Sequence, residues 1–484
     1  MHTETPPRLG PLTRLAYAIG GIAYGVKGNG FSYFLMFCYS QAFGLPPRLV
    51  GIALLLAFLL DAFSDPVIGF LSDNTRSRLG RRHLYMYAAI LPVGFAYYML
   101  WNPPVHLGQL GLFWYLVICG VGVRFLITFY EVPCTALNAE LTRDYDARTS
   151  LLTQRAVLVY FGGVIMAAVT LGFILQERDG ASAFTDAAGF GTYGAIGALV
   201  IMGSMLICSL GTQHFVPYLT RAHSVPPSFH DGLREVWQTL STPSLAALFG
   251  SQLAGFAAFG ISSSLIYYVQ GYFWEFTSQQ SSLITACVLV SALLSLAIGP
   301  TLSRRFGKRF TAFSLGAVAL VLSVGPVTLR LMGLMPENGT PALFWIILVV
   351  TTLDYACIIA MNATVSSMFS DLVEDAELRS GKRSEGLLFS VMTFTRKSVE
   401  GIGVLSASII LALIAFPEGA SPGEVDQDTI FRLGAFYTPA VFLFWTLMLV
   451  FIFRYRISRE DHEANLASLA ARAAAEQEDA GPHY

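Results

Sequence analysis

The stretch Asp61-Ala-Phe-Ser-Asp-Pro-Val-Ile-Gly-Phe-Leu-Ser-Asp-Asn-Thr-Arg-Ser-Arg-Leu-Gly-Arg-Arg82 decides the fold of this chain. Its first half is an apolar helix in which the carboxylates of Asp61 and Asp65 lie one turn apart, and its second half is a loop rich in glycine and arginine. A charged side chain at the centre of a membrane-spanning helix costs roughly 2.5–3.5 kcal/mol on insertion scales. Two acids on one face of one span therefore indicate a binding role, most simply for a cation.

The composition is that of a membrane protein. Hydrophobic residues make up 54% of the 484 residues and charged residues only 13%, against about 25% charged residues in ordinary soluble domains. Strands of a β-barrel would be about ten residues long with alternating polarity, whereas the apolar stretches here can cross about 30 Å of hydrocarbon as helices. We expect twelve such helices, at 13–42, 48–72, 83–101, 110–139, 152–175, 189–211, 244–274, 281–303, 310–333, 342–371, 387–416 and 430–455.

A weak internal repeat divides the chain into two halves. The loop 69–82 matches 299–309, and 139–148 matches 370–379, both at an offset of about 230 residues. Such repeats are typical of secondary transporters, whose substrate site lies between the halves near the middle of the membrane. The fold class we predict is an all-α membrane protein of two pseudo-symmetric six-helix bundles. Its parts are an N-terminal tail (1–12), the first bundle (13–213), a linker (214–243), the second bundle (244–456) and a tail (457–484).

The orientation follows from the loop charges. If both termini are cytoplasmic, the cytoplasmic segments hold twenty-one Lys and Arg residues, and the other side holds only Arg48, Arg178 and Arg432. Basic residues concentrate on the cytoplasmic side of membrane proteins. We therefore expect a multi-pass protein of the cell (inner) membrane with both termini in the cytoplasm.

Several motifs resemble one family, the glycoside–pentoside–hexuronide:cation symporters of the major facilitator superfamily. The resemblance covers essentially residues 13–456 and rests on the segment 61–82, Tyr130-Glu-Val-Pro133, the stretch 140–148, and the stretch 371–386 followed by Lys397. It implies the major facilitator fold and cation-coupled symport by alternating access. It also implies sugar transport and no cofactor other than a coupling ion, Na⁺ or H⁺.

The candidate cation site is built on Asp61 and Asp65. Carboxylates at i and i+4 lie about 6 Å apart and can share one hard cation through their oxygens or hold one proton between them. The resemblance places a coupling cation, the only metal we expect, on these acids. It adds Thr128 and Glu131 to the site. The alternatives are structural pairing of the two aspartates with a base, and an ion pair between Glu131 and Arg124.

Basic residues in the spans indicate the substrate. Lys397 is too deep for its ammonium group to reach the membrane surface easily, and it is either a countercharge to the acids when the cation is absent or a substrate ligand. Arg155 matches a sugar-contacting arginine of the family but would also suit a topology charge. We expect the substrate cavity to be bounded by Lys27, Asn29, Arg124, Glu131, Arg155, Asn362 and Lys397.

The aromatic residues on which a sugar ring would stack are missing. Thr135 and the region of Asn362 stand where the family's sugar permeases carry aromatic residues, and the cavity has more bases than acids. These features favour a substrate with a carboxylate or phosphate, such as a uronide or an anionic amphiphile, over a neutral glycoside. A sodium-coupled transporter of a lysolipid-like molecule is the alternative within the family.

The loop charges predict a gate on the cytoplasmic side. Asp73 and the loop arginines can pair with acids and helix ends of neighbouring spans, although their alternative role is topology alone. The expected gating residues are Asp73, Arg76, Arg78, Arg81, Arg82, Glu140, Asp144, Asp371 and Asp375.

Two other classes of function compete with transport. A membrane-embedded enzyme would use the same acids as acid–base groups, but the repeat and the loop arginines have no role in catalysis, so we do not expect an enzyme. A non-transporting sensor on a transporter scaffold stays open. The partners we expect are a small-molecule substrate and the lipid bilayer, not nucleic acid, and we expect the protein to act as a monomer.

Overall fold

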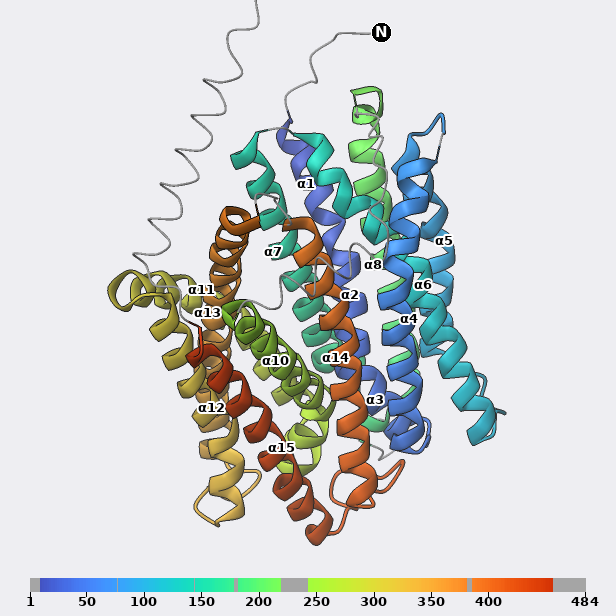
Figure 1. Ribbon diagram of the computed structural model, residues 1–484. Helices are drawn as coiled ribbons and strands as arrows, with labels where there is room; N and C mark the ends of the chain where they lie inside the picture. Colours follow the sequence, from blue (N-terminus) through green and yellow to red (C-terminus); the bar gives the residue numbers. More distant parts are fainter. Residues whose placement is uncertain are drawn as a thin grey trace, which may run out of the picture.

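A computed structural model describes residues 9–455 except 76, 143, 178–181, 219–242 and 381–384. The first half of the chain forms six membrane-crossing segments (Figure 1). The first of them is interrupted and consists of α1 (Pro11–Ile19), α2 (Gly21–Asn29), the π-helix η1 (Gly30–Phe34), α3 (Leu35–Phe37) and η2 (Cys38–Ala42). The others are α4 (Pro47–Asn74), α5 (Arg81–Trp101), α6 (Gln109–Leu141), α7 (Tyr145–Val169) with the π-helix η3 (Thr170–Ile174), and α8 (Ala187–Thr212).

The second half repeats this plan. Its segments are α10 (Pro243–Tyr268) with the π-helix η6 (Val269–Phe273), α11 (Ser278–Phe306), α12 (Lys308–Leu331), α13 (Pro341–Ser380), α14 (Glu385–Leu413) and α15 (Gln427–Phe453). Ten helices of the described chain are long and apolar enough to span a membrane. The interrupted first segment and the charge-bearing α14 complete the arrangement of twelve segments that the sequence predicts.

The apolar surface fits a bilayer. Large side chains such as Leu91, Leu199 and Leu293 point outward, while aromatic rings such as Trp101 and Tyr193 are buried between helices. Between the ends of a helix every backbone N–H and C=O group is hydrogen-bonded within the helix, which is the condition for crossing hydrocarbon. The side chains that face outward can therefore be lipid-facing without exposing polar backbone.

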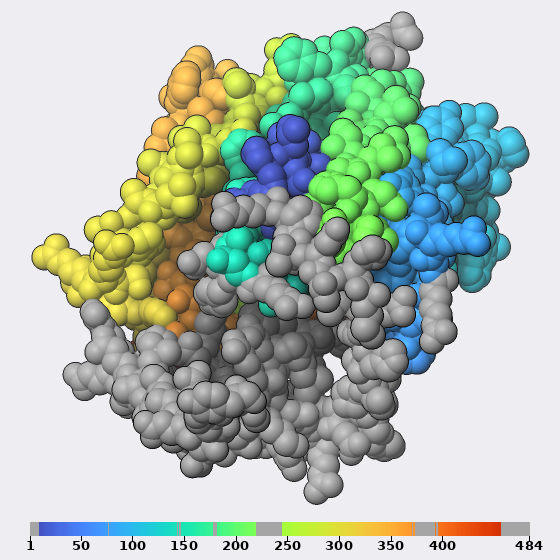
Figure 2. Space-filling model, turned by 90° about the horizontal axis from the view of Figure 1, so that it is seen from above, coloured from blue at the N-terminus to red at the C-terminus, as the bar shows by residue number. Residues whose placement is uncertain are grey.

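Both charged loops of the repeat lie on one face of the molecule, which we call the terminal face. Gln213 donates to the Leu79 carbonyl at 3.1 Å, and the neighbouring His214 lies 3.5 Å from Thr13 near the start of α1. Arg309, which follows α11, donates to the Phe453 carbonyl at the end of α15 at 2.6 Å. Figure 2 shows this face, with the end of α11 (yellow) and the start of α5 (blue) on opposite sides of it.

The two bundles meet along α4 with α14 and α7 with α11. Gly51 of α4 allows close packing there, because a Cβ atom at this position would lie 2.0 Å from the Ser408 hydroxyl oxygen. On the face opposite the terminal face, the hydroxyl of Ser278 donates to the Leu171 carbonyl, and Ser282 donates to the Ala168 carbonyl at 2.7 Å. The bundles are thus sealed together at the opposite face.

Candidate functional site

Asp61 is the most enclosed of the predicted site residues. Its side chain has no exposed surface, and its Oδ2 atom accepts from Arg124 of α6 at 2.7 Å. The hydroxyl of Thr128, one turn further along α6, donates to Oδ1 at 3.3 Å. These contacts arise because α4 and α6 pack side by side within the first bundle. Both carboxylate oxygens of Asp61 are therefore occupied by groups of α6.

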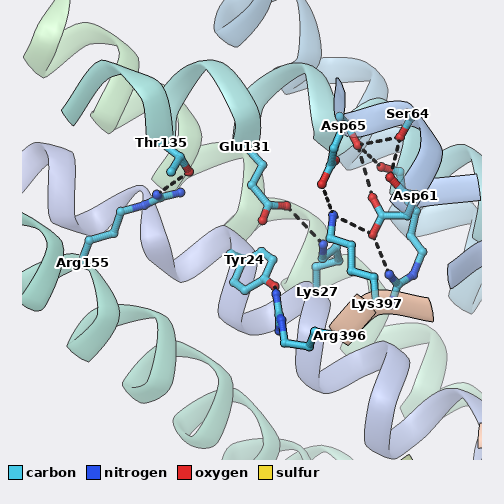
Figure 3. Close-up of polar contacts among 12 residues, drawn as sticks. Tyr24, Lys27, Asp61, Ser64, Asp65, Glu131, Thr135, Arg155, Arg396 and Lys397 are labelled. Carbon is cyan, nitrogen blue, oxygen red and sulfur yellow. Dashed lines mark hydrogen bonds and ion pairs between the residues drawn. The ribbon is translucent and has the colours of Figure 1, made fainter. Parts of the chain in front are cut away.

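Lys397 of α14 connects this bundle to the other one. Its Nζ atom lies 2.6 Å from Asp65 Oδ2 and 3.2 Å from Asp61 Oδ2 (Figure 3). The Asp65 side chain is 23% exposed, so this carboxylate is accessible where Asp61 is not. The single ammonium group therefore neutralises part of the charge of two carboxylates across the bundle interface.

Glu131 of α6 has a separate base. Its Oε2 atom lies 3.5 Å from the ammonium group of Lys27 on α2, and its side chain is 19% exposed. Lys27 also lies over the Tyr24 ring, 4.5 Å from the ring centroid. Figure 3 shows the ammonium groups of Lys27 and Lys397 beside each other, between Glu131 and the two aspartates. The alternative pairing of Glu131 with Arg124 is therefore not present, because Arg124 is bound to Asp61.

Arg124 is held on two further sides. Its guanidinium carbon lies 3.5 Å from the centroid of the Phe58 ring and 4.6 Å from that of Phe31. A guanidinium group is attracted to the face of an aromatic ring, and the attraction is stronger away from water. Arg124 is thus fixed in place by a carboxylate and two rings.

Two other arginines of the site bond to neutral oxygens. Arg155 of α7 donates to the Thr135 hydroxyl at 2.7 Å, while its buried Nε atom has no hydrogen-bond partner among the residues that the structure describes. Arg396 of α14 donates to the Tyr24 hydroxyl across the bundle interface at 2.7 Å. Thr135 therefore provides a hydrogen-bonding group that orients Arg155.

The remaining predicted substrate residues lie apart from this network. Asn29 packs against α7, where a Cβ atom on Gly163 would lie 2.0 Å from its Nδ2 atom. Asn362 of α13 is exposed. Both stay predicted substrate residues.

The predicted gating residues form ion pairs inside the bundles. Arg81 contacts Glu140 of α6, while Arg82 lies 2.9 Å from Glu140 and 3.2 Å from Asp73. In the second bundle, Lys308 lies 2.7 Å from Asp371. These pairs join neighbouring helices of one bundle at the terminal face, so a gating role would have to come from fixing the helix ends rather than from a direct bridge.

The other gating candidates contribute less. Asp144 is exposed and caps α7 by accepting from the Ala147 amide at 2.7 Å. Arg78 is exposed. Arg76 and the side chain of Asp375 lie outside the described residues.

Sequence reasoning missed several contributors. Phe31, Phe58 and Tyr24 were not singled out, because nothing in their spacing distinguishes them from other aromatic residues of the spans. Glu400 of α14, which accepts from Ser32 of η1 at 2.6 Å, was detectable as a buried acid one turn after Lys397. The interruption of the first segment by η1 had only its glycines as a signal, although π-helical turns often mark functional sites.

No three His, Cys, Asp or Glu side chains of the described chain converge as the ligands of one ion. Asp61, Asp65 and Glu131 are neighbours in one network but do not form a three-carboxylate cage. In this conformation a cation would contact fewer than all three.

Residues 16–459 match the family model described as MFS/sugar transport protein. The chain belongs to this family. The resemblance and the fold predicted from the motifs are thereby confirmed, and the family consists of transporters rather than enzymes. Membership also makes the chain a multi-pass membrane protein.

Relatives of this family have symporter and transporter names. The inner membrane symporter YicJ of Escherichia coli is 25% identical over 79% of this chain and 78% of its own length. The isoprimeverose transporter of Lactiplantibacillus pentosus is 26% identical over 82% and 79% of the two chains. The mouse sodium-dependent lysophosphatidylcholine symporter 1 is 24% identical over 95% and 88%.

The fold of the family also appears among solved structures. The nucleoside transporter NupG superimposes with a TM-score of 0.61 at 12% identity, over 93% of this chain and all of its own. At this identity the likeness shows the fold alone.

Proposed function

We propose that the protein is a cation-coupled symporter that moves a small organic solute by alternating access, driven by a sodium or proton gradient. The observation that carries the proposal is the contact of Lys397, in the second bundle, with Asp65 and Asp61 in the first. A mobile cation that displaces the Lys397 ammonium group from this contact changes the contact between bundles, and this links cation binding to bundle movement. The symporter names of the relatives support the same function.

The site supports a solute with an anionic group. Arg155 donates to the Thr135 hydroxyl and Arg396 donates to the Tyr24 hydroxyl, and both arginines lie beside the acid–base network. The central acids Asp61, Asp65 and Glu131 are matched by Arg124, Lys397 and Lys27. A bound cation therefore leaves positive charge for the solute to neutralise.

A uronide-type glycoside and a lysolipid-like amphiphile both carry such a group. The relative named an isoprimeverose transporter favours a sugar-containing solute. The relatives named lysophosphatidylcholine symporters favour the amphiphile as the second candidate. Asn29 and Asn362 would contact the polar part of either solute.

The positive-inside distribution supports a cytoplasmic terminal face and an inner-membrane location. In this orientation the sealed opposite face is the outer one, and the solute site opens toward the cytoplasm when the bundles separate there. The protein would act as a monomer, since each bundle pair contains a complete site.

Uptake into proteoliposomes tests the proposal. The purified chain is reconstituted and given a neutral disaccharide, a glucuronide or a lysolipid, with an inward Na⁺ gradient, a choline gradient or a pH gradient. We expect one anionic solute to accumulate only under a Na⁺ or pH gradient. Equal uptake under all gradients would contradict coupling, and chemical conversion of the solute would support the enzyme. Accumulation of the neutral sugar, unchanged in the Arg155→Gln variant, would overturn the anionic preference.

A further inference from the structure

The two aspartates of α4 have different surroundings although they are one turn apart. The Asp61 side chain has no exposed surface, and Arg124, Lys397 and Thr128 surround its two oxygens. The Asp65 side chain is 23% exposed and forms an ion pair with the Lys397 ammonium group. Asp61 is therefore enclosed and contacted at both oxygens, whereas Asp65 is partly exposed and can be approached by a cation.

Arg124 cannot easily leave Asp61. The guanidinium group keeps its charge at all relevant pH values, and it lies between the Phe31 and Phe58 rings while donating to the carboxylate. Both partners belong to the first bundle. Alternating access moves the bundles relative to each other, so this pair stays together through the cycle while the Lys397 contacts change.

The two lysines, Lys397 and Lys27, differ from Arg124 because each has a second group that its ammonium can contact. Lys397 already lies 3.2 Å from Asp61 and can transfer to it fully when another cation takes Asp65. Lys27 is 3.5 Å from Glu131, a long contact, and it lies over the Tyr24 ring, which attracts an ammonium group. Asp65 and Glu131 are thus partly exposed carboxylates, and each has an ammonium partner that a cation can replace.

We propose that Arg124 is the resident counter-ion of Asp61 and removes this carboxylate from the cation site, so that the transported cation is held by Asp65 and Glu131. This inference rests on the proposed symport function and deepens it. Asp61 becomes a positioning residue that holds Arg124 and receives Lys397. The sequence expectation that Asp61 is itself a cation ligand is replaced by this division of roles.

Two charge-matched double variants test the inference. Asp61→Asn with Arg124→Gln removes one acid and one base, and so does Asp65→Asn with Lys397→Gln. Both leave the site with the same net charge, so a difference between them does not come from electrostatic balance. Glu131→Gln, which keeps Lys397, separates the loss of a cation ligand from the loss of the lysine that joins the bundles. The single variant Asp61→Asn is the structural control, because it leaves the Arg124 charge buried without its partner and is expected to lower the thermal stability.

The measurement is cation-driven solute uptake by the full chain in proteoliposomes, with NaCl against choline chloride and an imposed pH gradient as the two probes. For Asp61→Asn/Arg124→Gln we expect a half-saturating cation concentration within about threefold of the original protein, since no cation ligand is lost. For Asp65→Asn/Lys397→Gln and for Glu131→Gln we expect an increase of about tenfold or more, or loss of the cation response. Arg124→Lys should preserve the response because it keeps the charge at Asp61.

Each outcome decides between the possibilities. If Asp61→Asn/Arg124→Gln melts at the original temperature yet loses its cation response as completely as Asp65→Asn/Lys397→Gln, Asp61 is a cation ligand and the inference is wrong. If the original protein transports solute with no response to either gradient, the proposed symport function fails first, and the inference fails with it. A folded first double variant with an intact response supports both.

Discussion

Lys397 of α14 lies 2.6 Å from Asp65 of α4, and this ion pair joins the two bundles within the interior of both helices. The partner carboxylate belongs to the bundle that also holds Glu131 and Lys27. In the proposed symport cycle, the movement of one bundle against the other would therefore be linked to the occupancy of one carboxylate.

The first prediction concerns this link. Lys397→Gln should abolish cation-driven accumulation while leaving solute equilibration across the membrane, because Asp61 keeps Arg124 and the half-exposed Asp65 can be hydrated. Uptake with and without the driving gradient measures the difference. Lys308→Gln is the control, since its partner Asp371 lies in the same bundle. Accumulation by Lys397→Gln at the original level would show that the pair does not couple the bundles.

The second prediction concerns solute charge. Arg155 donates to the neutral hydroxyl of Thr135, so no carboxylate neutralises it through this contact, and we expect it to bind the anionic group of the solute. Arg155→Gln should raise the KM for an anionic solute by about tenfold, because a hydrogen bond to a charged group contributes about 1.5–3 kcal/mol. The exposed Arg432, which pairs with Asp428, serves as the control position. An unchanged KM for the anionic solute would place its charge elsewhere.

The third prediction concerns closure of the opposite face. Gly51→Val should prevent the close approach of α4 and α14, because the added Cβ atom would lie 2.0 Å from the Ser408 oxygen. Transport should be lost. A cysteine placed in the seam, by which we mean the contact between α4 and α14, should become reactive from the opposite face. Gly122→Val in α6 is the matched control, since nothing lies within 4 Å of its added Cβ atom. Normal transport by Gly51→Val would mean that the seam opens and closes without this contact.

The fourth prediction concerns the terminal face. Glu140→Gln removes the carboxylate that binds both Arg81 and Arg82, and we expect a loss of about 1.5–3 kcal/mol in the free energy of unfolding. Thermal unfolding in detergent provides the comparison. Asp428→Asn should change the stability by less than about 1 kcal/mol, since exposed pairs contribute little. Equal effects of the two variants would argue against a structural role of Glu140.

The fold was readable because its signals are repeated. Apolar stretches of spanning length, the 230-residue offset and the motif from Asp61 to Arg82 all point to the same architecture. The central pairing was less readable. Arg124 and Glu131 lie two turns apart on α6 and suit each other as partners, but α4 places Asp61 opposite Arg124 instead. Which helix faces meet is a property of packing, and no spacing within one helix contains it.

The same reasoning explains Lys397. Its depth and charge predicted an acidic partner among the acids of the first bundle. The preference for Asp65 could not be predicted, because it depends on how α14 crosses α4. The rings of Phe31 and Phe58 could not be distinguished from lipid-excluding core residues without knowing where the guanidinium group lies.

The hydroxyl groups of Ser278 and Ser282 have a consequence for the energy of transport. They close the opposite face by donating to the backbone carbonyls of Leu171 and Ala168. When this contact between α7 and α11 opens, water can replace each of these partners, so the net cost is about 0.5–1.5 kcal/mol for each bond. A closure made of such exchangeable contacts behaves as a reversible latch, which an ion gradient of ordinary size can open and reset in every turnover.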